Sequence, residues 1–310
     1  MLSTVIILGI VIALAFDFLN GMNDSANAIA TIVSTKVLSP LVAVLWAAFF
    51  NFMAAFIFGT HVADTIGKGI VNPDLVNEYF ILAALIGAFI WLFICTHFGL
   101  PISVSHALIG GLIGPALFFH GPSSLVASGI LKIALFIILS PLIGFILGYF
   151  IMILTMLIFR RYSPLKVDHI FRYFQLFSSA IFSLGHGGND AQKTMGIITI
   201  LLYSGGVLAT PDVPTWVIYA CYSTISLGTL TGGWKVIKTL GSGLTDLKPV
   251  QGFCAETSGA VTLIGTALFG IPVSTTHTIA GSIVGVGITR RFSAVKWATA
   301  SNIVVAWVLT

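Results

Sequence analysis

The stretch FGLPISVSH at residues 98–106 recurs as FGIPVSTTH at residues 269–277. Extended to Gly114 and Gly285, the two copies share seven identities over 17 aligned positions, at an offset of 171 residues. Upstream, GMND at residues 21–24 aligns with GGND at residues 187–190, at the similar offset of 166 residues. Two matches in the same order at nearly the same offset indicate a chain built from two related halves, which we divide into residues 1–159 and 160–310.

The composition excludes a soluble protein. Of the 310 residues, 57% are hydrophobic and only 8% are charged, whereas soluble domains contain about 25% charged residues. Apolar residues form uninterrupted tracts such as 2–18, 41–58 and 80–96, each about long enough to cross a bilayer, which takes roughly 17–25 residues. The sequence therefore predicts an all-α membrane protein, a polytopic helical bundle in the lipid bilayer. The last tract, 297–310, is too short to cross at about 1.5 Å per residue, so we expect the chain to continue past Thr310.

The basic residues predict the orientation of the chain, and they do not indicate a nucleic-acid partner. Eleven of the fourteen lie in four short segments: Lys36; Arg160, Arg161, Lys166 and Arg172; Lys235, Lys238 and Lys248; Arg290, Arg291 and Lys296. Positively charged loops stay in the cytoplasm. The N-terminus is then outside the cell membrane (plasma membrane) and the basic loop 160–172 is inside. An odd number of crossings in the first half makes the halves two inverted-topology repeats.

Each repeat should contain a broken helix and a re-entrant helical hairpin. The broken helices are expected at residues 2–35 and about 171–203, with Gly21 and Gly187 at the breaks. The hairpins are expected at about 80–119 and 250–289. Their turns should lie at Pro101 and Pro272, because proline disfavours helix at the preceding residue and suits a helix start. The sequence leaves open whether each paired tract instead reaches the far side.

Asp24 and Asp190 occupy equivalent points of the two halves at membrane depth. An ionised group there is costly and usually faces a cavity or a partner. As hard oxygen ligands, with Asn23, Asn27 and Asn189 adding neutral oxygens, the two carboxylates predict a site for a small cation. The alternative is that they cap the following helices while the amides join helices. The same pair occurring twice at membrane depth favours the cation.

The two proline-containing turns offer anion chemistry. Hydroxyl side chains stand there at the start of a helix, where free N–H groups and the positive end of the helix dipole attract anions. His106 and His277 follow directly, but an intramembrane histidine is more often packed than bound to a ligand. An anion site beside carboxylates needs a cation between them. This arrangement suits cation-coupled anion uptake, in which each ligand strengthens the binding of the other.

These motifs resemble those of the inorganic phosphate transporter (PiT) family, sodium-dependent phosphate symporters of prokaryotic type. The family signature GANDVANA is matched at six of eight positions by GMNDSANA, residues 21–28. GGNDAQKT at residues 187–194 is similar to the form common in prokaryotic members, and Pro-x-Ser-x-x-His recurs at Pro101 and Pro272. The resemblance implies an inverted-repeat fold and symport of inorganic phosphate with sodium, or with protons in some members.

The resemblance and the motifs together give the expected site. We expect phosphate to be bound near the bilayer midplane by Ser103, Val104, Ser105, Ser274, Thr275, Thr276, Thr194 and Asn27. We expect sodium to be bound by Asn23, Asp24, Asn189, Asp190 and Glu256, of which Glu256 matches a family glutamate and could instead accept a proton. Further candidates are His106, His277, Gln192 and Lys193. Lys193 either attracts phosphate or pairs with Asp190.

The predicted function is secondary active transport that imports inorganic phosphate coupled to sodium by alternating access; the protein is not expected to be an enzyme. The alternative is proton-coupled symport of phosphate or sulfate. An ion channel is less consistent with paired hairpins, and an intramembrane hydrolase is disfavoured because adjacent residues such as Ser105 and His106 do not face each other on a helix. The expected partners are phosphate, co-transported sodium ions and lipid; a homodimer is left open.

Overall fold

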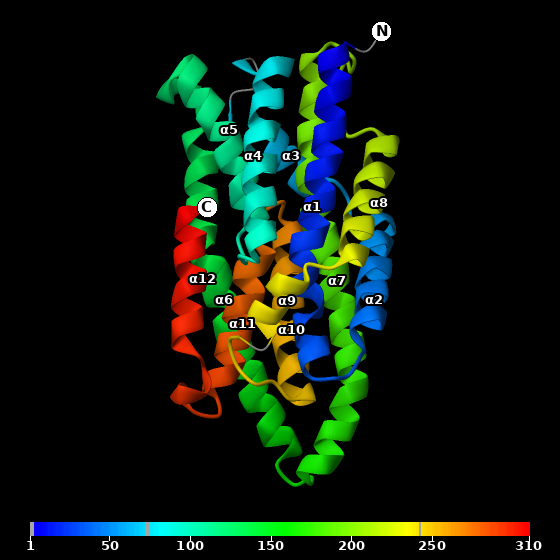
Figure 1. Ribbon diagram of the computed structural model, residues 1–310, viewed down its shortest axis with the longest axis vertical. Coiled ribbons are helices and arrows are strands. Elements are labelled where there is room, and N and C mark those ends of the chain that lie inside the picture. Colours follow the sequence, from blue (N-terminus) through cyan, green and yellow to red (C-terminus); the bar gives the residue numbers. More distant parts are fainter. Residues whose placement is uncertain (1–2, 72–74, 242) are drawn as a thin grey trace.

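The computed structural model describes residues 3–71, 75–241 and 243–310, which form a bundle of α-helices (Figure 1). Leu2, with which the first expected broken helix begins, lies outside these residues. The described helices are α1 (Thr4–Ser34), α2 (Pro40–Met53), α3 (His61–Lys68), α4 (Glu78–Phe98), α5 (Val104–His120), α6 (Ala127–Phe159), α7 (Pro164–Ser204), α8 (Thr215–Thr231), α9 (Trp234–Gly241), α10 (Pro249–Leu268), α11 (Thr275–Ile288) and α12 (Trp297–Leu309). Three of them, α1, α4 and α6, are long and apolar enough to cross a membrane. The predicted all-α helical membrane bundle is confirmed.

Two long helices, α1 and α7, form the centre of the bundle and run in opposite directions (Figure 1). Ser3 caps the start of α1 by accepting a hydrogen bond from the Ile6 N–H at 3.2 Å. Pro164 begins α7, where its missing N–H costs nothing. The central stretch of each helix, which contains the GMND or GGND motif, is almost wholly buried.

The breaks predicted at Gly21 and Gly187 are wrong, because α1 and α7 are continuous through both glycines. A Cβ at Gly21 would lie 2.0 Å from the carbonyl oxygen of Ile225, and one at Gly187 would lie 2.6 Å from that of Asn51. The glycines thus allow α8 and α2 to approach the two central helices. Keeping the helix intact also avoids unpaired backbone groups, which are costly inside a membrane.

Two helical hairpins reach the centre from opposite ends of the bundle (Figure 1). The first consists of α4 and α5 and the second of α10 and α11, close to the residue ranges that the sequence predicts. Gly99 and Gly270 follow the ends of α4 and α10. Their φ angles are 71° and 62°, the left-handed conformation that suits glycine. Ser103 and Ser274 then cap the second helix of each hairpin. The hairpin tips, residues 99–105 and 270–276, meet directly, since the Thr276 hydroxyl lies 3.0 Å from the Ile102 carbonyl oxygen.

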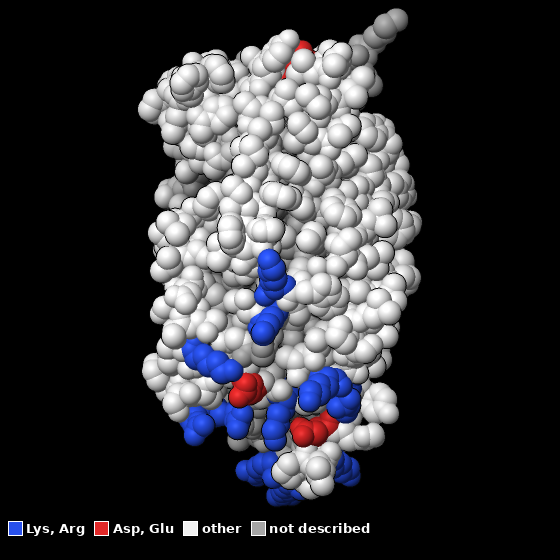
Figure 2. Space-filling model, in the orientation of Figure 1, with Lys and Arg blue, Asp and Glu red and all other residues white. Residues whose placement is uncertain are grey.

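Charge is distributed unevenly over the outer surface. Figure 2 shows lysine and arginine side chains gathered at the lower end of the face in view, with a broad uncharged surface above them. Large apolar side chains such as Phe56, Phe118 and Val308 are exposed, as expected of a surface that faces lipid. α6 ends at Phe159 and α7 begins at Pro164; the division into two inverted-topology repeats at this point stays a prediction.

Candidate functional site

Asp24 of α1 and Asp190 of α7 lie together where the two hairpin tips meet. Their exposed fractions are 2% and 1%. The Thr275 hydroxyl oxygen lies between them, 2.9 Å from Asp24 Oδ2 and 3.2 Å from Asp190 Oδ2. A hydroxyl has one proton and can donate to only one carboxylate at a time. Two buried carboxylates this close repel each other, so the pair needs either a positive charge or a shared proton beside it.

The tip of the second hairpin binds the Asp24 side of the site. The Thr276 hydroxyl lies 3.3 Å from Asp24 Oδ1. The amide nitrogen of Asn27, one turn after Asp24, donates to the hydroxyls of Thr276 at 2.9 Å and Thr275 at 3.3 Å. The hydroxyls that this tip places on Asp24 therefore bring it no positive charge.

The Asp190 side of the site contains a cation. Lys193 forms an ion pair with Asp190 Oδ1, and its ammonium also donates to the Ser105 hydroxyl at 2.6 Å and to the Val273 carbonyl at 3.0 Å. Of the two roles that the sequence left open for Lys193, pairing with Asp190 is the one present in this structure. Ser105 in turn lies 3.2 Å from the Val273 carbonyl oxygen, so both hairpin tips meet at this lysine.

His186, which the sequence motifs did not predict as a ligand, also belongs to the site. Its Nε2 lies 3.4 Å from Asp190 Oδ2, and ligand atoms of Asp24, His186 and Asp190 all lie within 4.8 Å of one another. Nδ1 lies 3.0 Å from Asn51 Oδ1, while the amide nitrogen of Asn51 donates to Thr229. The sequence does carry a signal for this contact, because His186 and Asp190 are four residues apart and such residues share a face of a helix.

Neutral oxygens that are free to bind a cation stand next to the two aspartates or one turn away along their helices. The carboxamide oxygens of Asn23, Asn27 and Asn189 are buried and have no hydrogen-bond partner among the described residues. The amide nitrogen of Asn23 donates to Thr96 at 2.9 Å, which fixes the direction of its oxygen. Carboxylate and carboxamide oxygens are the ligands that a hard cation prefers. The arrangement is therefore chemically suited to a small cation.

Glu256 lies in a separate cluster rather than beside the aspartates. Its carboxylate accepts hydrogen bonds from Thr31 at 2.6 Å, Gln175 at 2.9 Å and Ser178 at 2.5 Å. Thr31 follows Asp24 by seven residues, or about 10 Å along a helix, toward the basic end of the bundle. Nothing in the motifs indicated Gln175 or Ser178, because their partner is remote in the sequence.

Two other expected ligands point away from the hairpin tips. The Thr194 hydroxyl donates to Asp17 Oδ1 at 2.8 Å. Gln192 accepts from the Val62 N–H at 2.9 Å and donates to the Gly188 carbonyl at 2.6 Å. Both follow the GGND motif closely in the sequence, but the helix turns their side chains toward α1 and α3.

The expected anion ligands surround the start of α5 and α11. Ser103 and Ser274 accept capping bonds from the backbone N–H groups of His106 at 3.3 Å and His277 at 3.2 Å. Each hydroxyl keeps its own proton for another partner. The first N–H groups of a helix, which here belong to Val104, Ser105, Thr275 and Thr276, have no intrahelical acceptor. All of these side chains are buried, so the site is closed to both faces of the bundle.

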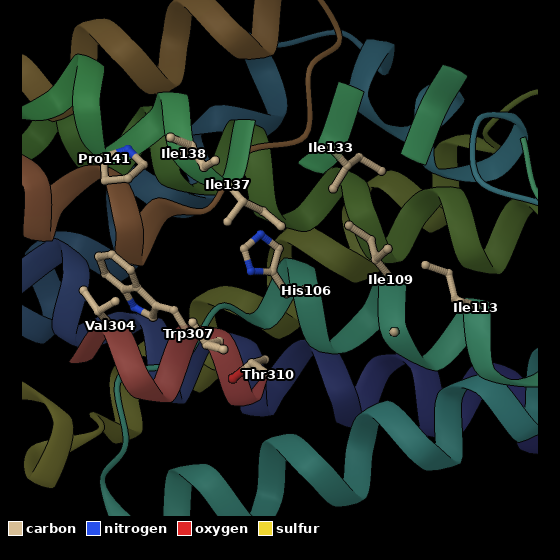
Figure 3. Close-up of a pocket in the computed structure, with 12 residues that line it drawn as sticks. His106, Ile109, Ile113, Ile133, Ile137, Ile138, Pro141, Val304, Trp307 and Thr310 are labelled. Atoms are coloured by element: carbon tan, nitrogen blue, oxygen red, sulfur yellow. The ribbon is translucent and has the colours of Figure 1, made fainter. Parts of the chain in front are cut away.

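The two histidines after the hairpin tips are packed against aromatic rings. The rings of His106 and His277 lie 4.8 Å apart, and His277 stacks on Trp307 at 3.8 Å. His106 also lines a cavity of about 510 Å³ whose walls are otherwise mainly apolar. Figure 3 shows His106 in this cavity facing isoleucine side chains, with Trp307 and Thr310 nearby. The few polar groups of this lining belong to His106, Trp307 and Thr310, so the cavity offers an anion fewer donors than the hairpin tips do.

A helical membrane bundle whose hairpin tips enclose buried carboxylates has the architecture of a membrane transporter. The model of the phosphate transporter family matches residues 20–167 and 160–310. The chain belongs to this family, which confirms the resemblance based on its motifs.

Named relatives agree with this assignment. The probable low-affinity inorganic phosphate transporter of Rhizobium meliloti is 56% identical over 97% of this chain and 90% of its own. The protein of the same description from Bacillus subtilis is 45% identical over 98% and 92%. A solved structure described as the sodium-dependent phosphate transporter has a TM-score of 0.92 and 28% identity, over 99% of this chain and 95% of its own. These relatives are transporters, which supports the prediction that the protein is not an enzyme.

Proposed function

We propose that this protein imports inorganic phosphate together with sodium by alternating access. The observation that carries the proposal is the buried pair Asp24 and Asp190, which shares the single proton of Thr275. A sodium ion beside Asp24 would supply the missing charge, with the free oxygens of Asn23 and Asn189 as neutral ligands. The description of the structural neighbour as sodium-dependent supports this choice of ion.

Phosphate would bind between the hairpin tips, close to the sodium. The N–H groups at the start of α5 and α11 and the hydroxyls of Ser103, Ser105, Ser274, Thr275 and Thr276 supply the donors; Asn27 positions the two threonines. The anion offsets the charge of the cation, so each ligand improves the site for the other. The family assignment and the names of the relatives support phosphate as the substrate.

The burial of this site supports alternating access, because neither ion can enter or leave unless the hairpins separate from the central helices. We propose that this opening occurs on one side of the membrane at a time. We place the N-terminus outside the cell membrane and the basic loop 160–172 in the cytoplasm. Glu256 then lies between the central site and the cytoplasm, where it offers a second binding site for a cation or a proton. A homodimer stays a prediction.

Uptake of radiolabelled phosphate into proteoliposomes tests this function, with sodium, potassium and proton gradients imposed one at a time. A sodium gradient alone should drive accumulation, and protein-free liposomes are the control. Uptake driven only by the proton gradient would replace sodium coupling with proton-coupled symport. If sulfate competes for uptake as well as unlabelled phosphate does, the proposed selectivity for phosphate is wrong.

A further inference from the structure

The two halves of the central site differ at one pair of equivalent positions. Three residues after Asp24 the chain has Asn27, whereas three residues after Asp190 it has Lys193. Asn27 is neutral and bonds only to threonine hydroxyls in the described contacts. Lys193 is charged and is 2% exposed. A buried lysine is costly unless its charge is fully compensated, so its partners show what it does there.

Each proton of the Lys193 ammonium has an acceptor. The three acceptors are the Asp190 carboxylate, the Ser105 hydroxyl and the Val273 carbonyl. They come from α7, from the tip of the first hairpin and from the tip of the second. A carboxylate, a hydroxyl and a backbone carbonyl are also the oxygen types that bind a hard metal cation. The ammonium thus occupies an oxygen-lined place that joins the central helix to both tips.

The charges of the two aspartates and of Lys193 do not cancel. Asp24 and Asp190 contribute two negative charges and Lys193 one positive charge, which leaves one negative charge on these three residues. With both aspartates ionised, Lys193 pairs with Asp190, whereas the hydroxyls that contact Asp24 bring no charge, so the remaining charge lies on the Asp24 side.

We propose that the Lys193 ammonium is a built-in cation that takes the place of one co-transported ion. A site with a neutral residue at position 193 binds one more cation for each phosphate than this protein does. The proposal rests on the proposed function, which it deepens by assigning one of the positive charges to the protein itself. It makes Lys193 a residue that determines the ratio of cation to phosphate.

Lys193→Asn tests the proposal, because it copies the residue found at position 27. Radiolabelled sodium bound by the purified protein at saturating phosphate should rise by one ion per chain relative to wild type. The sodium-to-phosphate ratio of uptake should rise by the same amount. Lys132→Asn, which removes the charge of an exposed lysine on α6, is the control and should match wild type in both measurements. An unchanged sodium count in folded Lys193→Asn would overturn the proposal.

A second variant covers the case in which Lys193→Asn is unstable. Asp190→Asn/Lys193→Asn removes both members of the ion pair, leaves one negative charge, and should bind the wild-type number of sodium ions. Sodium should also raise the melting temperature of the single variant more than potassium does at the same ionic strength, because a ligand stabilises the fold that binds it. A double variant that binds the extra ion would show that the lost charge is not the cause, and would overturn the proposal.

Measurements on wild type and on Lys193→Asn together distinguish a failure of this proposal from a failure of the proposed function. If wild-type protein transports phosphate without any sodium effect, sodium coupling fails. Lys193→Asn should still acquire a sodium response in that case, because the vacated place is lined by oxygens. No sodium response in either protein would overturn both.

Discussion

At the scale of single residues, the site depends on two aspartates that are equivalent in sequence but different in surroundings. Asp24 meets the hydroxyls of Thr275 and Thr276, whereas Asp190 also meets Lys193 and His186. Removing the charge of each should therefore have different consequences. Asparagine is the informative replacement because it keeps the size of the side chain and its ability to accept hydrogen bonds.

Asp24→Asn should abolish sodium-driven phosphate uptake without loss of stability. The change removes the charge that the sodium ion is expected to neutralise, but it leaves no buried charge unpaired. Uptake into proteoliposomes and the melting temperature in detergent are the two measurements. Wild-type uptake by this variant would contradict the cation role and favour a structural role for Asp24.

Asp190→Asn should instead lower stability, because it leaves the Lys193 ammonium buried without its carboxylate. Breaking a buried ion pair on one side costs about 3–5 kcal/mol. Chemical unfolding of the purified protein measures this loss, and Asp24→Asn is the matched control. Equal stability of the two variants would mean that Lys193 has another charge partner.

The sequence predicted much of this site, but not its contacts. Both aspartates, the hydroxyls at the tips and the alternative roles of Lys193 followed from two repeated motifs. Glu256 was assigned to the central site, yet it bonds to Thr31, Gln175 and Ser178 instead. Such a partnership joins residues 78 and more positions apart, and it is set by how α1, α7 and α10 pack rather than by any local pattern.

At the scale of elements, the helix breaks predicted at Gly21 and Gly187 are absent, since α1 and α7 continue through both glycines. A glycine inside an apolar run predicts either a break or a close approach, and the sequence alone does not separate the two. In α1 and α7 the close approach occurs, to the backbone of α8 and α2. The hairpins were predicted well, because a proline and a capping serine mark each turn locally.

Gly21→Ala should destabilise the protein by pushing α8 away from α1, since the added Cβ would lie 2.0 Å from the Ile225 carbonyl oxygen. Overpacking of this kind typically costs about 1–3 kcal/mol. Gly87→Ala in α4 is the control, because its Cβ would meet nothing within 4 Å. The melting temperatures should fall for the first variant and hold or rise for the second. The packing explanation fails if both variants behave alike.

At the scale of the whole molecule, the arrangement of charge and the direction of the helices both indicate how the chain is oriented in the membrane. α1 and α7 run in opposite directions, and the two hairpins enter from opposite ends (Figure 1). Basic side chains gather at one end of the bundle (Figure 2). This end should face the cytoplasm. If the two halves are inverted repeats, as we predict, they would give the site two equivalent routes of access, one to each side of the membrane.

This orientation predicts which side of the membrane each loop faces. Ser123 and Ser163 are both exposed, and neither caps a helix with its side chain, so a cysteine should be tolerated at either. The native residues Cys95, Cys221 and Cys254 are buried free thiols and are replaced first. In sealed cells, a membrane-impermeant maleimide should label Ser123→Cys from outside and should label Ser163→Cys only after the membrane is opened. Since α6 alone connects the two positions, labelling of both from the same side would mean that α6 does not cross the bilayer. The odd number of crossings in residues 1–159 would then be lost, and the opposite orientation of the halves with it.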